Sequence, residues 1–391
     1  MARLLTFALF LSIMVTLTGS AHYYVWSRLV RDPGLPASLS RTLSYGLIFL
    51  FATIPASLFV RRSALGGSAS GLVWLAMTWL GLLLFLTLAV GAADLARGVW
   101  QVGRAWSHAE PILPERRQAV ARLLAGAAAL VAGSLGLWSL RAGLGRVAIK
   151  RVEVSLARLP PALSGTRILH LSDVHVGPTI QRGFIETIVA QCNALSADLI
   201  VITGDLVDGS VEELREHVAP LAGLRAKYGV FFVTGNHEYY SGAADWCGEL
   251  VRLGVRVLRN ERVSIGDATA SFDLAGVDDH SAHRFGGGHG EDLPKALHGR
   301  DLSRELVLLA HQPRTILEAK DHGVGLQLSG HTHGGQLWPW TYLVRLQQPV
   351  VAGLARFGNS LVYVSCGTGY WGPPMRLGAP SEIAELTLRS A

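Results

Sequence analysis

The chain has 391 residues, enough for two or three domains; half of them are hydrophobic and only 16% are charged. This balance argues against a wholly soluble protein and predicts a membrane portion. The formal net charge of +6 comes largely from arginines between apolar runs, which suggests lipid headgroups rather than nucleic acid as partners.

The first 150 residues contain four uncharged apolar stretches, each about the length that a helix needs to cross a bilayer core, roughly 20 residues. Tryptophan, tyrosine and arginine residues lie at their ends, as they do where helices meet the membrane surface. The first stretch could instead be a signal peptide, but three more follow and there is no clear small-residue cleavage site. We therefore expect a multi-pass membrane region over residues 1–150, with helices at 4–21, 42–60, 71–93 and 123–140.

Four spans would place both ends of this region on the same side of the membrane. The arginine and lysine residues near the span ends are almost equally divided between the two sides, so the positive-inside rule leaves the side of the C-terminal region open. No ionisable residue lies within the four stretches, which argues against an ion or proton path and hence against a transporter.

After residue 150 the pattern changes to short β-rich runs that each end in polar residues. Helix-like stretches at 183–195 and 211–224 separate some of these runs, and the alternation predicts an α/β sheet. Ligand groups in such sheets gather just beyond the carboxyl ends of strands, so the runs can deliver side chains to one site. Gly204, Gly235 and Gly330 would let the chain turn sharply out of the sheet. The runs are residues 167–175, 197–208, 229–238, 305–313 and 324–333.

The polar residues that close these runs are carboxylates, imidazoles and a carboxamide, with no thiolate among them. This mixture suits Zn, Mn or Fe, and it is more than one ion needs. Two ions roughly 3.5–4 Å apart, bridged by a carboxylate, would use it well. The set consists of Asp173, His175, Asp205, Asp208, Asn236, His237, His311, His331 and His333.

The spacing DxH, GDxxD, GNHE, H and GHTH resembles that of the calcineurin-like metallophosphoesterase superfamily over about residues 165–391. All five blocks occur in order, each after an expected strand, whereas one block alone would be weak evidence. Longer stretches, AGVDDH, LSGHTHGGQ and VYVSCGTGYWGPPMRLGAPSEI, resemble the bacterial membrane-associated branch. The resemblance implies a four-layer α/β sandwich for a metallophosphoesterase domain at residues 151–391, preceded by an all-α bundle of about four transmembrane helices in a bacterial cell membrane.

The resemblance also implies a role for each of these residues. One metal would be held by Asp173, His175, Asp205 and His333; the second would share Asp205 and add Asn236, His311 and His331. A hydroxide between the two metals would attack phosphorus in line. His237 corresponds to the histidine beside the leaving oxygen, and Asp208 and Glu238 would orient its ring. Asn236 and His237 would also contact the substrate.

The expected reaction is hydrolysis of a phosphomonoester or a phosphodiester. A membrane tether raises the local concentration of lipid-borne substrates, which makes a phospholipid or a lipid-linked phosphate a candidate. The alternatives are a phosphodiesterase for soluble nucleotides and a non-catalytic metal-binding sensor. The GNHE block argues against the sensor, because a sensor need not keep His237 with Asp208. Nucleic acid is not favoured, since the C-terminal region lacks an extended Lys/Arg stripe with interleaved aromatic residues.

Two further groups of residues allow more than one interpretation. The histidine-rich segment 278–299 could bind a third metal or line the substrate entrance, but its irregular ligand spacing favours a mobile, solvated loop. Four aromatic residues near the last motifs could form an apolar rim that reaches lipid headgroups, or could be ordinary packing. They are Trp338, Trp340, Tyr370 and Trp371.

Overall fold

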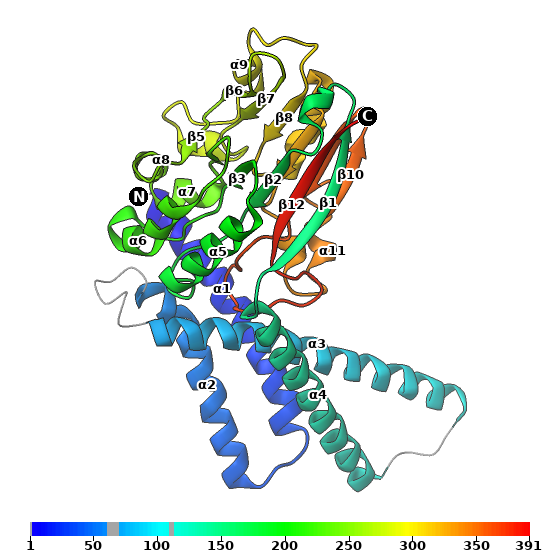
Figure 1. The fold of residues 1–391 in the computed structure, drawn as a ribbon. Coiled ribbons are helices and arrows are strands. Elements are labelled where there is room, and N and C mark those ends of the chain that lie inside the picture. Colours follow the sequence, from blue (N-terminus) through cyan, green and yellow to red (C-terminus); the bar gives the residue numbers. More distant parts are fainter. Residues whose placement is uncertain (1, 61–69, 109–112) are drawn as a thin grey trace. The chain divides into compact units, whose positions relative to one another are not determined.

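The computed structural model describes residues 2–60, 70–108 and 113–391, and Figure 1 labels its elements. The chain divides into two compact units. One consists of Met1–Arg141 with Gly372–Met375 and is called the helical unit below; the other consists of Ala142–Trp371 with Arg376–Ala391 and is called the sheet unit.

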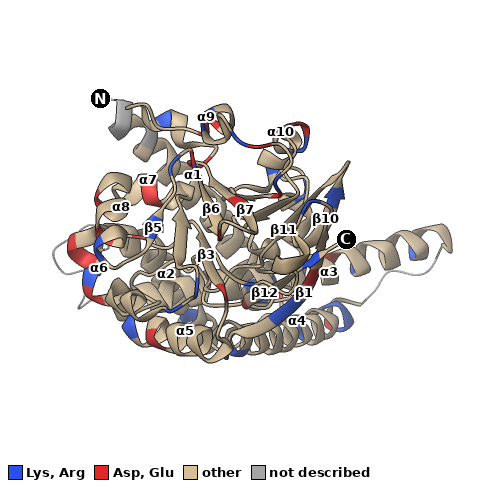
Figure 2. Cartoon of the chain, turned by 45° about the horizontal axis from the view of Figure 1, so that its top comes forward, with Lys and Arg blue, Asp and Glu red and all other residues tan. Residues whose placement is uncertain are grey.

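The helical unit contains four long helices, and all four are apolar enough over their length to cross a membrane. This confirms the prediction of a multi-pass membrane protein. The helices run beyond the apolar stretches at one or both ends. Helix α3 carries few charged residues, since it is tan over most of its length in Figure 2, where Lys, Arg, Asp and Glu are coloured blue or red. The bounds are α1 (Ala2–Trp26), which continues into the π-helical turn η1 (Ser27–Arg31), α2 (Ala37–Val60), α3 (Ser70–Trp106) and α4 (Pro114–Gly143).

The extension of α3 brings charge close to the apolar stretches. Asp94 follows the expected span directly, and its carboxylate pairs with Arg28 at 2.8 Å and Arg97 at 2.7 Å. The hydroxyl of Tyr24 donates to the same carboxylate at 2.9 Å. This network neutralises a carboxylate that would otherwise be costly near the membrane.

The sheet unit is built from two six-stranded sheets. The first has the order β1-β12-β2-β3-β4-β5 and the second β10-β11-β9-β8-β7-β6. Strands β2 to β5 are parallel, as are β7, β8, β9 and β11, while β12 is antiparallel to β2. The bounds are β1 (Ala148–Leu156), β2 (Arg167–Leu171), β3 (Leu199–Thr203), β4 (Val230–Val233), β5 (Arg256–Val257), β6 (Glu261–Gly266), β7 (Ser271–Gly276), β8 (Leu306–Leu309), β9 (Leu326–Ser329), β10 (Gly353–Phe357), β11 (Ser360–Val364) and β12 (Glu382–Ser390).

Helices cover the outer faces of both sheets. The helices of the sheet unit are α5 (Arg182–Leu195), α6 (Val211–Val218), α7 (Asn236–Ser241), α8 (Ala243–Arg252), α9 (Leu293–Leu297), α10 (Ile316–Ala319) and α11 (Thr341–Val344). The shorter helical turns are η2 (Pro161–Leu163), η3 (Ala219–Gly223), η4 (Ala282–Phe285), η5 (Pro313–Thr315), η6 (Lys320–His322) and η7 (His333–Gly335).

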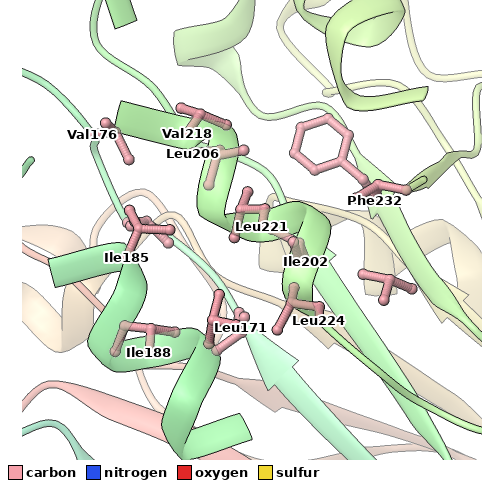
Figure 3. Packing of buried hydrophobic residues seen from close by; sticks show 14 of the residues in the cluster. Leu171, Val176, Ile185, Ile188, Ile202, Leu206, Val218, Leu221, Leu224 and Phe232 are labelled. Atoms are coloured by element: carbon pink, nitrogen blue, oxygen red, sulfur yellow. The ribbon is translucent and has the colours of Figure 1, made fainter. Parts of the chain in front are cut away.

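Three apolar cores hold these layers together. In the first, Ile185 and Ile188 of α5 pack toward Leu171 and Ile202 of the first sheet, as Figure 3 shows. The second core joins the inner faces of the two sheets, and the third joins the second sheet to α9 and α10. The layers therefore run helix, sheet, sheet, helix, which confirms the expected four-layer α/β sandwich.

Strands β3, β4 and β8 are apolar without alternation because both of their faces are covered, whereas β9 (LQLS) also carries buried polar side chains. Every residue of β3, β4, β8 and β9 is buried. Strand β12, from the end of the chain, lies between β1 and β2 and so flanks the strand that leads into the DxH block. Strand β1 begins at Ala148, just before the boundary expected between residues 150 and 151.

Candidate metal centre

The predicted site residues all follow the carboxyl ends of five strands, three in the first sheet and two in the second. The two sheets meet at these ends. His311, after β8, places its ring Nδ1 2.6 Å from the carbonyl oxygen of Thr203 at the end of β3. The backbone N–H of His331, after β9, donates to Asp173 at 2.9 Å. These contacts bring side chains from both sheets into one site.

The first ligand group consists of Asp173, His175 and His333. The Nε2 atoms of His175 and His333 lie 3.0 Å apart, and Nε2 of His333 lies 3.5 Å from Oδ1 of Asp173. All three residues are buried. Their ligand atoms lie within 4.8 Å of one another, close enough to share one ion.

The second ligand group consists of Asp205, His311 and His331. Nε2 of His311 lies 3.1 Å from Oδ2 of Asp205 and 3.2 Å from Nδ1 of His331. The contact of His311 Nδ1 with the Thr203 carbonyl sets the tautomer, which leaves the Nε2 lone pair toward the group. Oδ2 of Asp205 is also 3.9 Å from Nε2 of His175, so this carboxylate lies between the two groups.

The chemistry of these donors fits divalent metal ions. Imidazole nitrogens and carboxylate oxygens suit Mn, Zn and Fe. Oδ1 of Asn236 is buried and has no hydrogen-bond partner in the part of the chain that the structure describes. A buried carbonyl oxygen without a donor is costly unless something else binds it, and a cation would satisfy it. The structure thus contains two candidate ligand groups with Asp205 between them.

A third group lies beside the first and consists of His175, Asp208 and His237. Oδ1 of Asp208 is 2.5 Å from Nδ1 of His237 and 3.2 Å from Nδ1 of His175. The backbone N–H of His237 donates to Oδ1 of Asp205 at 2.9 Å. Asp208 is therefore placed to orient the ring of His237, and it contacts His175 as well, which the sequence did not indicate.

Buried charges shift the pKa of several of these groups. Burial alone would lower the pKa of His237, but the carboxylates of Asp205 and Asp208 raise it to about 9. Burial opposes the ionisation of Asp208, yet its contacts with His175 and His237 hold its pKa well below the usual range for Asp. Without metal ions, the carboxylates therefore favour the protonated form of the His237 ring.

The ligand residues adopt backbone conformations that L-residues rarely use. Asp173, His175, Asp205, His331 and His333 all have positive φ, between 50° and 69°. Each such residue costs about 1 kcal/mol or more, and this strain persists only where the surrounding structure enforces it. The tight turns aim consecutive side chains from a strand end into the same small volume.

The glycines of the motifs serve two purposes. Gly204 has φ of +82°, so it makes the turn that its position predicts. Gly330 does not have a positive φ, and a Cβ there would lie 1.9 Å from Oγ of Ser172 and 2.1 Å from Oδ2 of Asp173. A Cβ on Gly235 would lie 2.2 Å from Oδ1 of Asp205. Gly235 and Gly330 thus also allow close approach of the backbone to these side chains, which the sequence did not indicate.

Glu238 has a different position from the one expected. Its carboxylate is buried and accepts the backbone N–H groups of Asp205 at 3.0 Å, Leu206 at 2.8 Å and Gly235 at 2.6 Å. Burial, with Asp205 nearby, raises the pKa of Glu238 to about 7. Glu238 therefore ties the loop after β3 to the start of α7 and does not orient the ring of His237.

Arg376 is a further residue of the site that the sequence did not single out. Its guanidinium is buried and donates to the carbonyl oxygens of Cys366 at 2.7 Å and Ala379 at 2.9 Å. Its Nη2 lies 3.3 Å from Nδ1 of His333. The only signal in the sequence was an arginine in a glycine-rich and proline-rich tail. Arg376 thus fixes the chain segment that backs His333.

Exposed aromatic side chains surround His237. The ring of Tyr240 lies 5.5 Å from it and that of Trp371 lies 5.9 Å away, both edge to face. Of the four residues suggested for an apolar rim, Trp338, Trp340 and Trp371 are each more than half exposed. Tyr370 is buried at 4% exposure, and its hydroxyl donates to the carbonyl of Thr179. Tyr370 therefore fits ordinary packing, the other of the two interpretations, and is not part of an exposed rim.

The histidine-rich segment 278–299 forms no metal-ligand group in the parts of the chain that are described, since the three groups above contain none of its histidines. Nδ1 of His280 instead lies 2.7 Å from Glu291, and Nη2 of Arg259 donates to Nδ1 of His289 at 2.9 Å. His280 thus has its partner within the segment, and His289 has its partner in Arg259, outside it.

Known proteins are similar to this chain in sequence. Residues 166–335 match the family model of the calcineurin-like phosphoesterases. An uncharacterized metallophosphoesterase of Campylobacter jejuni is 30% identical over an alignment of 394 positions, which covers 98% of this chain and 99% of that one. A bovine transmembrane protein with metallophosphoesterase domain is 44% identical over 62% of this chain. An uncharacterized metallophosphoesterase of Helicobacter pylori is 42% identical over 63% of it. The matches span 57% of the bovine chain and 65% of the Helicobacter chain.

Proposed function

Because this chain belongs to the calcineurin-like metallophosphoesterase family, we propose that it is a membrane-anchored hydrolase of phosphoesters that uses two divalent metal ions. The observation that carries the proposal is the position of Asp205, whose carboxylate lies 3.1 Å from His311 of one ligand group and 3.9 Å from His175 of the other. A carboxylate between two such groups can bind both ions of a pair that lie roughly 3.5–4 Å apart.

Each ion would be held by residues from both sheets. One set is Asp173, His175, Asp205 and His333, and the other is Asp205, Asn236, His311 and His331. When bound, two such ions supply an activated water at neutral pH and neutralise the phosphoryl oxygens. Mn, Zn and Fe all suit these donors.

His237 would donate a proton to the leaving oxygen. Its Nδ1 is engaged with Asp208, so Nε2 is the atom that can give the proton. That Nε2 lies 3.9 Å from Oδ2 of Asp205, beside the ligand groups. Asp208 would keep the ring oriented and protonated until transfer. Asn236, with Oδ1 turned to an ion, would use its Nδ2 amide to bind the phosphoryl group.

We propose a phospholipid or a lipid-linked phosphate as the substrate. The four apolar helices support this choice because they keep the enzyme in the membrane, where such substrates are concentrated. The exposed rings of Tyr240 and Trp371 beside His237 support it as well, since they offer apolar surface to the leaving group. A soluble-nucleotide phosphodiesterase and a non-catalytic sensor are the alternatives to be tested.

The first experiment measures turnover of bis-p-nitrophenyl phosphate and p-nitrophenyl phosphate by the detergent-purified full chain. Metal is removed with a chelator, and Mn, Zn, Fe or Mg is then added back singly. We expect turnover with at least one metal. In Asp205→Asn the turnover rate should fall about 100-fold or more, whereas loss of a group that only supports a ligand typically lowers activity about 10- to 100-fold. Asp321→Asn, at an exposed carboxylate of the sheet unit, is the matched control.

The same preparation tests the substrate class. We expect a higher kcat/KM for amphiphilic phosphoesters than for soluble ones of the same leaving-group chemistry. Equal kcat/KM for both would remove support for a lipid substrate and favour soluble nucleotides. If the folded protein binds metal but turns over neither soluble nor lipid phosphoesters, the sensor is favoured.

A further inference from the structure

A second feature of the sheet unit is an exposed apolar patch just after the last metal-ligand motif. It consists of Trp338, Trp340, Tyr342, Leu343 and Leu346, and it is called the aromatic patch below. These side chains are between 49% and 81% exposed, although they follow His333 by only a few residues. Single exposed apolar residues are ordinary, but five within nine positions, each about half exposed or more, indicate an interaction site.

The charged residues next to the patch along the chain have one sign. No aspartate or glutamate occurs between Asp321 and Glu382, whereas Arg345 and Arg356 are exposed. The guanidinium of Arg345 lies 5.9 Å from the ring of Tyr342. Tryptophan, tyrosine and leucine together with arginine are the residues that enter the interface of a bilayer with anionic lipids.

The patch is held in place by the backbone and is not a loose tail. The N–H of Trp338 donates to the carbonyl of Leu377 at 2.9 Å, and the N–H of Trp340 to that of Leu337 at 2.8 Å. The hydroxyl of Thr341 donates to the carbonyl of Gly334, next to His333, at 3.1 Å. The patch is thus fixed to the turn that carries a metal ligand.

Hydrogen bonds also connect the start of the patch to the segment beside His237. The side-chain amide of Gln336 donates to the carbonyl of Trp371 and accepts its N–H, both at 2.9 Å. The ring of Trp371 in turn lies 5.9 Å from the ring of His237. Gln336, two residues before Trp338, therefore ties the start of the patch to the segment that carries Trp371 beside His237.

We propose that the aromatic patch inserts into the interface of the membrane in which the chain is anchored, with anionic headgroups against Arg345. The chain itself argues for a bilayer as the occupant. Only four residues separate the end of α4 at Gly143 from the start of β1 at Ala148, which span at most about 15 Å. The start of the sheet unit is therefore always close to a lipid surface, which favours a bilayer over another protein as the occupant of the patch.

The test places a fluorescent reporter on the patch in the full chain. Leu346→Cys, at a position 81% exposed, is labelled with bimane and reconstituted in vesicles of phosphatidylcholine and phosphatidylglycerol, with or without doxyl-labelled lipid. Leu302→Cys is the matched control, because Leu302 is 70% exposed on the same unit but lies outside the patch. Burial raises the pKa of the native thiols, to about 12 for Cys192 and Cys366, which favours labelling of the new cysteine.

We expect doxyl lipid to quench bimane at position 346 at least about two-fold more than at 302. Equal quenching at the two positions would overturn the proposal. The patch would then face water or protein, not lipid. This readout needs no enzymatic activity, so it stands or fails apart from the proposed function.

The patch should also matter for activity on membranes. We expect the double variant Leu343→Asp/Leu346→Asp to hydrolyse a vesicle-borne phosphoester at least about five-fold more slowly and to turn over bis-p-nitrophenyl phosphate at an unchanged rate. Leu302→Asp should alter neither rate. Equal rates on the vesicle-borne substrate in both variants would contradict it.

Discussion

Oδ1 of Asp208 lies 2.5 Å from Nδ1 of His237, and the same oxygen is 3.2 Å from Nδ1 of His175. One carboxylate therefore orients both the proposed proton donor and a proposed metal ligand. We expect Asp208→Asn, which keeps the shape and loses the charge, to lower kcat about 10- to 100-fold at saturating metal. Steady-state kinetics beside Asp321→Asn checks this. Unchanged kcat in Asp208→Asn would mean that its charge has no part in the reaction.

The role of His237 predicts a dependence on the leaving group. An alkoxide needs a proton as it departs, whereas p-nitrophenolate does not. His237→Asn should therefore lower kcat by about 10²- to 10⁴-fold for an alkyl phosphoester and far less for a p-nitrophenyl ester. The measurement compares kcat for the two esters in wild type and variant. An equal loss for both esters would point to binding or charge stabilisation instead of proton donation.

Arg376 should matter through the segment that it fixes. Its donors serve the carbonyls of Cys366, Gly369 and Ala379, and lysine cannot replace this planar set. We expect Arg376→Lys to lower Mn affinity about 10- to 100-fold and to lower the melting temperature. Titration calorimetry and thermal unfolding, with the exposed Arg356→Lys as control, measure both quantities. Wild-type Mn affinity in a folded Arg376→Lys protein would show that His333 does not depend on this support.

His170 should make the sheet unit sensitive to acid. It is fully buried beside Thr203, and burial lowers its pKa from 6.5 to about 3. The neutral ring is favoured in the folded state, so its contribution to stability is complete above pH 6.5 and is lost as the pH falls toward 3. Between pH 7 and pH 5 this loss amounts to about 2 kcal/mol.

The variant His170→Gln removes this titration. Unfolding of the metal-free protein, measured at pH 7 and pH 5, should depend less on pH in His170→Gln than in wild type. The exposed His322→Gln is the control and should behave as wild type. The account of His170 fails if all three proteins lose the same stability over this interval.

The architecture of both units could be predicted from local patterns. Long uncharged stretches can only be helices that cross a membrane or lie in a large core, and four of them favour the membrane. Continuous apolar runs such as LIVIT at β3 are buried on both faces, and their carboxyl ends hold the polar blocks. The ligand residues could be named because each stands directly after such a run.

What the sequence could not indicate depends on contacts between distant segments. Arg376 and His333 lie 43 residues apart, and no periodicity relates them. Tyr370 and Trp371 are adjacent, yet one is buried and the other exposed, because the chain there follows no regular element. Glu238 accepts backbone N–H groups of the loop after β3. Every residue type except proline has such a group, so the sequence does not indicate these partners. The need for Gly330 comes from Ser172 and Asp173, in the loop after β2 of the other sheet.

The most direct test of a binuclear site measures how many ions each chain binds and whether their spins are coupled. Chelator-treated full-length protein is titrated with Mn, while activity and the electron paramagnetic resonance spectrum are recorded at each ratio of Mn to chain. We predict that activity saturates at about two Mn per chain, with the spectrum of an exchange-coupled pair, and that Asp205→Asn loses the coupling. Saturation at one Mn per chain, with an uncoupled spectrum and full activity, would contradict the proposal that Asp205 joins two metal sites.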